Sequence, residues 1–455
     1  MKNIIINKKT PFDREKNDIP LIKLLIHTES FHQAIIDEEL TINSLIDLSQ
    51  FKFLNIIFTP TDSNDVIKIL EQKGVEITEY KQCKDFITIK SRTFENVVLM
   101  GKDLDKYKNN LVEGSSVNKI DLFTARNNYF DYFVVSENDN FFKSKYRKSK
   151  DVDSINAIDL VRILLVNLGY FYVNPYYKVN EGYYYLYRFK KLFFNYQYSW
   201  SNVVSLHGKN ISEDVFNQFD SLSLRLEMIC RAADKVSFYD LKYANNDTQD
   251  NTVYHLGYLI MLITGVFDDV AWIITKLYSL KLSNMEVGLK IPSKKTSTKF
   301  YNKLHIKNIK LYEYLTNNII QNKIKMVYPL RDTLQHREFM KGIHYLEKSS
   351  GYEKNLYRIP KKVVDCIKVF SKGDLKEFGI MWCDGNLYYI EAHTFVSNLL
   401  NVVTEIINNV LALIDWKEYL KILSTKELEV LQQTNNKFNQ GIGKFLGWCQ
   451  EPIYF

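Results

Sequence analysis

The sequence has 455 residues, of which 46% are hydrophobic and 25% are charged, and this composition excludes a protein that is largely disordered. The formal net charge of +7 is too small to define a nucleic-acid-binding protein by itself. Five scattered cysteines without a C-x-x-C pair indicate neither a zinc site nor a disulfide framework.

The apolar runs in the sequence are short. Residues 1–9 contain no apolar stretch as long as that of a signal peptide. A run such as 258–266 ends in charge well before the ~20 residues that a membrane span needs. We therefore expect a soluble cytoplasmic protein with no membrane partner.

Short apolar runs alternate with helical spacing over residues 1–165. The runs predict strands at 21–26, 53–58, 86–90 and 132–135, and the spacing over 66–73 predicts a helix. Such alternation is typical of an α/β domain. We therefore expect residues 1–165 to form an α/β domain.

Tyrosines crowd the next segment, residues 166–209, which we interpret as a connector. Its ten tyrosines stand among basic residues. Rings of this kind are most often core residues, although they also stack on unpaired bases. Just before the connector, Lys145, Arg147 and Lys148 belong to a run of five cations. This run is either a solvated loop or a set of contacts to RNA phosphates.

Helical periodicity dominates residues 210–425. Helices are predicted over 219–236, 255–280, 311–328 and 394–415. A lysine-rich break at 290–303 separates two of them, and Asp384-Gly385 suits the tight turn of a β-hairpin over 378–390. The sequence thus predicts a mainly α bundle with an inserted hairpin, followed by a tail over 426–455.

The segment Tyr328-Pro-Leu-Arg-Asp-Thr-Leu-Gln-His-Arg337 carries the strongest chemical signal. Pro329 either kinks the preceding helix or begins a new one in its first turn. Asp332 and His336 are four residues apart and share a helix face, so the carboxylate can orient the imidazole. Histidine moves protons near neutral pH, and Arg331 offers planar donors to a phosphate.

This segment resembles the active-site helix of the HEPN ribonucleases, which are four- to five-helix proteins with an R-x4-6-H motif. The match covers roughly residues 210–425 by helix order and is specific at the motif. The resemblance implies a metal-independent endoribonuclease without a cofactor, with Arg331, Asp332 and His336 as catalytic residues and Arg337 as an RNA contact. Two copies of the motif meet across a dimer in active members, so one copy here implies a homodimer.

The resemblance also implies a biological setting. The family's usual company is a bacterial toxin or antiphage-defence system, with an antitoxin or regulatory protein as partner. Members controlled by adenylylation carry a tyrosine two residues after the histidine, where this sequence has Glu338. Asp268 and Asp269, on the preceding long helix, either face the motif or have a structural role. Because many members only bind, a non-catalytic RNA- or nucleotide-binding module is the alternative function.

The segment 119–142 resembles the later part of a PIN-like domain, whose nucleases gather carboxylates around magnesium or manganese. Asp121 matches the carboxylate that opens a helix in that family. Asn138, followed by Asp139, stands where an acid is expected, and His27 replaces the first aspartate. We interpret residues 1–165 as a degenerate PIN-like fold that holds no metal. The alternative is an active metal nuclease in which three nearby acids compensate, namely Glu29, Glu137 and Asp139.

Overall fold

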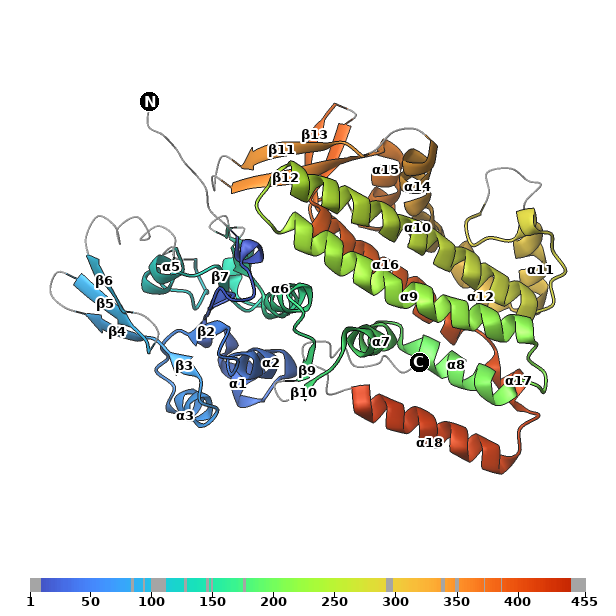
Figure 1. Cartoon of the computed structure of the whole chain (residues 1–455), viewed down its shortest axis with the longest axis horizontal. Helices are drawn as coiled ribbons and strands as arrows, with labels where there is room; N and C mark the ends of the chain where they lie inside the picture. Colours follow the sequence, from blue (N-terminus) through green and yellow to red (C-terminus); the bar gives the residue numbers. More distant parts are fainter. Residues whose placement is uncertain are drawn as a thin grey trace. The chain divides into compact units, whose positions relative to one another are not determined.

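The structure is a computed structural model of the chain (Figure 1). It describes residues 10–82, 86–92, 95–99, 112–126, 129–144, 147–148, 150–174, 177–291, 298–336, 340–347, 352–371, 373–385 and 387–442. These residues form two compact units, an N-terminal unit up to Asn180 and a C-terminal unit that starts at Glu181.

A parallel sheet lies at the centre of the N-terminal unit. Within the described residues its strands follow the order β3-β2-β1-β7-β8, and every pair is parallel. The strands are β1 (Lys23–Ile26), β2 (Asn55–Phe58), β3 (Glu76–Ile77), β7 (Tyr132–Val134) and β8 (Asp151–Val152). The helices are α1 (His32–Ile36), α2 (Leu40–Leu48), α3 (Asn64–Gln72), α5 (Lys119–Arg126) and α6 (Ser154–Asn167). The predicted α/β architecture is confirmed.

Two smaller sheets complete this unit. One is antiparallel and contains β4 (Glu79–Gln82), β5 (Phe86–Lys90) and β6 (Glu95–Leu99). The other pairs β9 (Tyr172–Asn174) with β10 (Tyr177–Lys178). The four strands predicted from apolar runs coincide with β1, β2, β5 and β7.

The central strands form because their apolar runs can be buried on both faces. All of β2 is buried, and so are Leu24, Leu25 and Ile26 of β1, as expected for parallel strands covered by helices. Ser63 starts α3 by accepting a hydrogen bond from the backbone N–H of Val66. The strand order reverses at β1, which has β2 on one side and β7 on the other. Such a switch point is where α/β sheets bind ligands.

The C-terminal unit is mostly helical. Its helices are α7 (Glu181–Leu192), α8 (Phe194–Leu206), α9 (Glu213–Asp240), α10 (Asn246–Leu277), α11 (Lys299–Lys307), α12 (Ile309–Thr316), α13 (Asn318–Lys325), α14 (Val327–His336), α15 (Lys361–Phe370), α16 (Ala392–Ala412), α17 (Trp416–Leu420) and α18 (Thr425–Ile442). A sheet of β11 (Gly342–Glu347), β12 (Tyr352–Ile359), β13 (Ile380–Asp384) and β14 (Leu387–Ile390) has the order β11-β12-β14-β13.

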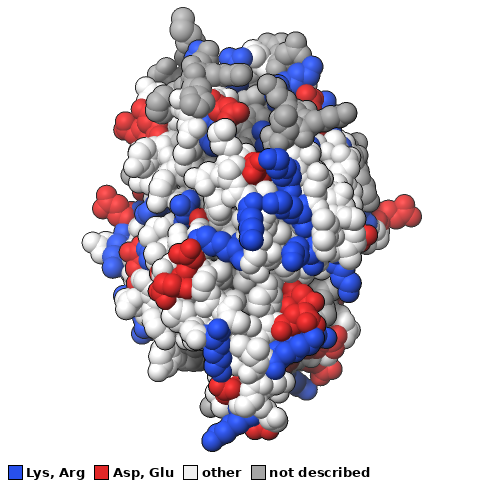
Figure 2. Space-filling model, turned by 90° about the vertical axis from the view of Figure 1, so that its right-hand side faces the viewer, with Lys and Arg blue, Asp and Glu red and all other residues white. Residues whose placement is uncertain are grey.

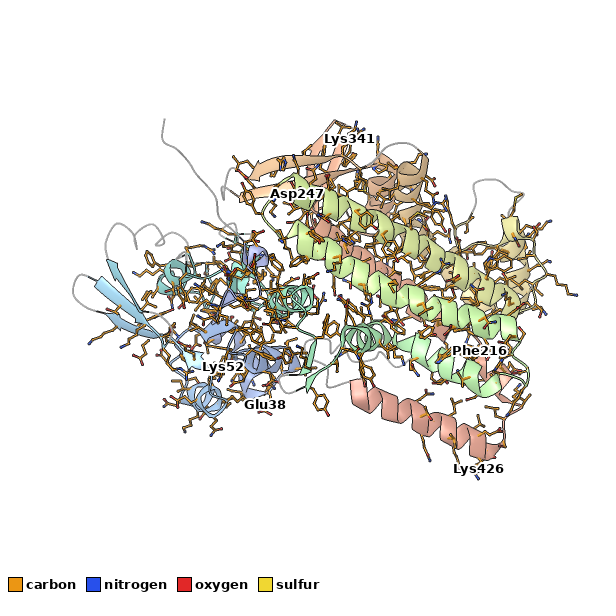
Figure 3. All side chains as sticks on the ribbon, in the orientation of Figure 1. Glu38, Lys52, Phe216, Asp247, Lys341 and Lys426 are labelled. Atoms are coloured by element: carbon orange, nitrogen blue, oxygen red, sulfur yellow. The ribbon has the colours of Figure 1, made fainter. Side chains whose placement is uncertain are left out.

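Three long helices, α9, α10 and α16, build the core of this unit (Figure 1). Their side chains fill the space between the ribbons (Figure 3). Asn245 caps α10 by accepting a hydrogen bond from the backbone N–H of Thr248, whose hydroxyl in turn accepts from the backbone N–H of Asn245. The predicted helices over 219–236, 255–280 and 394–415 are confirmed, each within a longer or shifted helix.

Helices α10 and α16 are long and apolar enough to cross a membrane by length and composition. Most of the apolar window of each is buried inside the protein, at 67% for α10 and 61% for α16. A helix that is apolar on most sides belongs either in a membrane or in a protein core. The burial observed here is typical of core helices in a soluble protein.

The segment expected as one helix over 311–328 contains two breaks. The side chain of Asn317 accepts hydrogen bonds from the backbone N–H groups of Ile319 and Ile320, so α13 begins anew after α12. A further helix, α14, begins at Val327 and places Pro329 in its first turn. Of the two alternatives for Pro329, the structure therefore shows the new helix.

The hairpin predicted over 378–390 exists, but it is half of a larger sheet. Its strands β13 and β14 pair in antiparallel fashion, and Gly385 has a φ of 58° at the turn. Strand β14 also pairs with β12, which pairs with β11. The predicted hairpin is therefore confirmed, but the other two strands of its sheet, β11 and β12, were not predicted. Polar residues such as Glu353 and Lys354 hide the strand character of β12 in the sequence.

Two other segments, predicted as a connector and a tail, contain helices. The tyrosine-rich connector contains α7 and α8, in which Tyr184, Tyr185 and Tyr196 are buried. The boundary between the two units in the sequence falls within that connector, between Asn180 and Glu181. The segment expected as a tail begins with α18.

Asp240 links the end of α9 to the start of α16 and makes stability depend on pH. Its carboxylate accepts a hydrogen bond of 2.7 Å from the backbone N–H of His393. Burial and the negative charge of Glu391 raise its pKa from 3.8 to about 7, while Lys354 and backbone N–H groups oppose the shift. The folded state thus holds this proton more tightly than the unfolded chain does. The stabilising contribution is complete below pH ~4 and is lost as the pH rises through ~7.

We expect Asp240→Asn, which keeps the acceptor oxygen, to flatten the dependence of the thermal midpoint on pH between ~4 and ~7. The variant should be more stable than the parent at pH ~8, because no charge is then buried beside Glu391. Thermal unfolding across this pH range measures both effects. A parent-like slope in the variant would contradict the assignment.

Candidate active site

Helix α14 carries the R-x4-H motif and is seated on α10 by apolar contacts. Leu330 is fully buried. Leu334 lies against Gly257 of α10, where a Cβ atom would be 3.6 Å from the Cδ2 atom of Leu334. Nε2 of Gln335 lies 3.4 Å from the sulfur of Met261. The two leucines are thus the apolar anchors of the motif helix.

The side chain of Arg331 is held in place by contacts, while one nitrogen of its guanidinium group remains available to a ligand. Its Nε and Nη2 donate to Oδ1 of Asp332 at 3.2 and 2.9 Å. Its guanidinium carbon lies 5.1 Å from the centre of the Tyr328 ring. The side chain is 31% exposed, and Nη1 has no hydrogen-bond partner among the described residues. The arginine is therefore oriented and still able to donate to an anion.

His336 is the last residue of α14, and the structure describes its backbone but not its side chain. The expected contact between Asp332 and the imidazole thus lies outside the described residues. The partner that the structure does show for Asp332 is Arg331. Arg337 and Glu338 also lie outside the described residues.

Two acidic residues of α10, Asp268 and Asp269, relate Arg331 to Arg225 of α9. Desolvation raises the pKa of Asp268, while the positive charges of Arg331 and Arg225 oppose this shift. Its neighbour Asp269 pairs with Nε of Arg225 at 3.1 Å and accepts from Gln218 at 2.7 Å. Burial raises the pKa of Asp269 to about 6. Asp268 therefore interacts with the motif arginine, whereas Asp269 anchors Arg225.

Arg225 is the site residue that sequence reasoning missed, and Gly265 is the signal that could have found it. A Cβ atom at Gly265 would lie 1.8 Å from Nη1 of Arg225. A glycine inside a long helix costs about 1 kcal/mol relative to alanine. Its presence in α10 is explained by the arginine that crosses this helix toward Asp269.

We expect Gly265→Ala to displace Arg225 without unfolding the protein, because the side chain that must move is long and flexible. The thermal midpoint should stay equal or rise through helix propensity. For the ribonuclease activity that the resemblance at the motif implies, a phosphate contact from Arg225 predicts a fall in RNA cleavage of about tenfold, the loss of roughly one charge-assisted hydrogen bond. The thermal midpoint and the rate of RNA cleavage are both measured on the purified protein.

Gly257→Ala is the matched control for this variant. It makes the same change in the same helix, but its Cβ would be in ordinary contact with Leu334 at 3.6 Å. This control should keep the parent rate of cleavage. Equal rates in the two alanine variants would exclude Arg225 from the site.

Further positive charge surrounds Tyr328 at the start of α14. Nζ of Lys290 lies 4.6 Å from the centre of the Tyr328 ring, and Arg331 lies close to the same ring. Burial raises the pKa of Tyr328 above its ordinary value. Desolvation and the charges of Arg331 and Lys325 lower the pKa of Lys290, while Asp332 opposes the shift. These cations make the start of α14 a favourable place for a phosphate.

Two residues of the basic run over 143–150 are held by contacts with neighbouring residues. The guanidinium of Arg147 lies 4.2 Å from the centre of the Phe142 ring. Lys148 is exposed, and its backbone N–H donates to Asp151 at 2.7 Å. Lys145 lies outside the described residues. Arg147 and Lys148 thus belong to a loop whose exposed lysine can contact solvent or a phosphate.

His27 directly follows β1, the strand at the switch point of the N-terminal sheet, and it forms a hydrogen bond with Asp121 of α5. The backbone N–H of Ser30 donates to Nδ1 of His27 at 3.3 Å, so the ring proton belongs on Nε2. Nε2 then donates to Oδ2 of Asp121 at 3.2 Å, and both side chains are buried. The hydroxyl of Tyr80 donates to the other oxygen of Asp121 at 2.9 Å. Each oxygen of this carboxylate thus already has a partner.

Asn138 and Asp139 are the other residues that the PIN-like resemblance indicates, and Asp139 belongs to a different hydrogen-bond network from Asp121. Asn138 is exposed. Asp139 accepts hydrogen bonds from Ser115, Ser116 and the backbone N–H of Phe141, and these bonds lower its pKa. Its carboxylate therefore holds a loop and caps a short helical turn. The structure does not show Asp121 and Asp139 sharing one site.

Glu29 and Glu137, which would compensate for the missing acid in the alternative of an active metal nuclease, are not shown next to Asp121. Glu29 is exposed and accepts a hydrogen bond from the hydroxyl of Thr61. Glu137 is exposed as well. Within the described residues, no group of three or more His, Cys, Asp or Glu side chains could hold a metal ion.

Basic side chains also gather on one face of the C-terminal unit. Figure 2 shows Lys and Arg side chains across the middle of the face that carries α11 and α12. Lys307 and Lys310, from these helices, are exposed.

Comparison of the chain with family models, with curated proteins and with solved structures finds no match.

Proposed function

We propose that the protein is a homodimeric, metal-independent endoribonuclease of HEPN type whose active site is on α14. The observation that carries the proposal is the state of Arg331. It is fixed by Asp332 and by the Tyr328 ring, yet Nη1 remains available and the side chain is 31% exposed. An oriented, partly open guanidinium beside other cations suits a phosphate whose charge increases during reaction.

In the proposed reaction, His336 moves the protons and Arg331 stabilises the phosphate. A base removes the proton of a ribose 2′-hydroxyl, and that oxygen attacks the adjacent phosphorus. The bond from phosphorus to the 5′-oxygen breaks, and an acid protonates the leaving oxygen. The products carry a 2′,3′-cyclic phosphate and a 5′-hydroxyl. DNA, which lacks the 2′-hydroxyl, is not cut, and the reaction uses no cofactor.

The homodimer in this proposal is supported by an apolar stripe beside the motif. On α10, Tyr254 is 70% exposed, Tyr258 47% and Met261 40%. Their spacing places them on one helix face, and Met261 contacts Gln335 of α14. Exposed apolar surface of this kind marks interaction sites. A second copy packed on this stripe would bring two motif helices together.

The biological role belongs to the proposal as well. We infer a cytoplasmic bacterial toxin or antiphage-defence effector, with RNA as substrate and an antitoxin or regulatory protein as partner. This role follows from the resemblance at the motif.

Incubation of purified protein with a structured RNA in EDTA tests the proposed activity. Cleavage that leaves 2′,3′-cyclic phosphate ends supports it. Binding without cleavage would indicate the alternative, a non-catalytic RNA- or nucleotide-binding module. A metal-dependent activity that is lost in Asp121→Ala would assign nuclease activity to the N-terminal unit instead.

A further inference from the structure

Three aromatic rings of the N-terminal unit form a stack that is only partly buried. The rings of Phe53 and Tyr170 are 4.8 Å apart between centroids and 12° from parallel. Tyr172 continues the arrangement at 6.4 Å from Tyr170 and 24° from parallel. Phe51, which is buried, packs edge-on against Tyr172 at 4.8 Å and anchors the stack. We name Phe53, Tyr170 and Tyr172 the aromatic stack.

Exposed lysines accompany the aromatic stack. Nζ of Lys16 lies 4.7 Å from the centre of the Tyr170 ring, and Nζ of Lys178 lies 5.7 Å from the same centre. Lys52, between two of the aromatic residues in the chain, is exposed as well. Two ammonium groups near one ring repel each other, so an anion placed between them is favoured.

We propose that the aromatic stack and its lysines bind single-stranded RNA. Bases stack on Tyr170 and Tyr172, while Lys16 and Lys178 pair with the flanking phosphates. Stacking of a base on an aromatic ring is stronger than an exposed cation–π contact, so a base displaces the ammonium group from the ring. The displaced lysine then lies next to the backbone of the RNA.

The chemistry of this surface favours single strands over other partners. A planar ring with cations around it matches a base joined to a phosphate, the repeating unit of a single strand. The bases of a duplex are stacked on one another and cannot reach the rings. This surface belongs to the N-terminal unit, so the proposal is independent of the activity proposed for α14.

Fluorescence anisotropy with a labelled single-stranded oligouridine of about 10 nucleotides tests the proposal. The full-length protein carries His336→Ala, so that the RNA stays intact whether or not the parent cleaves it. Tyr170→Leu should weaken binding about tenfold, which corresponds to the loss of one stacked base. Tyr170→Phe, which keeps the ring, should bind as the parent does.

Tyr198→Leu is the matched control, because Tyr198 is 46% exposed and lies in the other unit. Equal affinity of Tyr170→Leu and Tyr198→Leu for the oligouridine would overturn the proposal. The variants Lys16→Ala and Lys178→Ala test the proposal separately, even if Tyr170→Leu does not fold. Each should reduce the slope of log K against log salt by about 1, and unchanged slopes in both would also overturn it. Equal affinity for a duplex of the same length would exclude base stacking.

Discussion

Replacing His336 with alanine is expected to lower the rate of RNA cleavage by ~10²- to 10⁴-fold, the usual contribution of a general acid or base. Arg331→Ala should cost ~10²- to 10³-fold, because the charge that develops on the phosphate loses its oriented donor. The initial rate of cleavage of a labelled RNA at saturating substrate measures both. The affinity of His336→Ala for RNA should change little.

Two controls separate catalysis from folding in this experiment. Arg331→Lys keeps the charge but loses the planar fork, so its rate should lie between those of the parent and Arg331→Ala. Thr333→Ala changes a residue of the same helix whose hydroxyl donates to the backbone carbonyl of Pro329 within that helix, and it should keep the parent rate. If Arg331→Ala and His336→Ala both cut RNA as fast as the parent, α14 is not the active site.

Asp151→Ala is expected to destabilise the N-terminal unit by about 3–5 kcal/mol, because it leaves a largely buried arginine without its charge partner. Both oxygens of Asp151 accept from Arg126, at 2.5 and 2.6 Å, and the two side chains are 0% and 11% exposed. This pair joins β8 to the end of α5, the helix that carries Asp121. Chemical denaturation measures the free energy of unfolding.

A double variant and a surface pair are the controls for this prediction. Arg126→Met combined with Asp151→Leu removes both charges and should cost much less than Asp151→Ala. Glu418 pairs with Lys421 at 2.6 Å, but the two side chains are 60% and 66% exposed. Glu418→Ala should therefore change stability by less than about 1 kcal/mol. A similarly small effect of Asp151→Ala would show that the buried pair is not needed.

The sequence was sufficient to predict elements whose pattern is local. Continuous apolar runs located β1 and β2, and helical spacing located α10 and α16. It was insufficient where a single polar residue decides the outcome, as at Asn317, whose side chain starts α13 within an unbroken apolar periodicity. The strands β11 and β12 were missed because polar residues interrupt them. The helices α7 and α8 were not predicted, because the clustered tyrosines and basic residues of this segment were interpreted as a connector.

The residues of the candidate site also divide into those related by the local sequence and those brought together only by the fold. Arg331 and Asp332 are neighbours in the sequence, and their pairing is local. Arg225 comes from a different helix and reaches the site only because α9 packs on α10, so the sequence marks it only through Gly265. In the N-terminal unit, the pairing of His27 with Asp121 depends on the sheet that brings them together. It could not be read from either residue alone.

The proposed chemistry is tested most directly by an RNA with a single 2′-deoxynucleotide at the preferred cleavage site, incubated with the protein in EDTA. The attacking oxygen is the 2′-hydroxyl, so we predict that the all-ribose RNA is cut to a 2′,3′-cyclic phosphate and that the substituted RNA stays intact at that position. Cleavage of both RNAs at the same rate, or of neither, would contradict a metal-independent ribonuclease on α14.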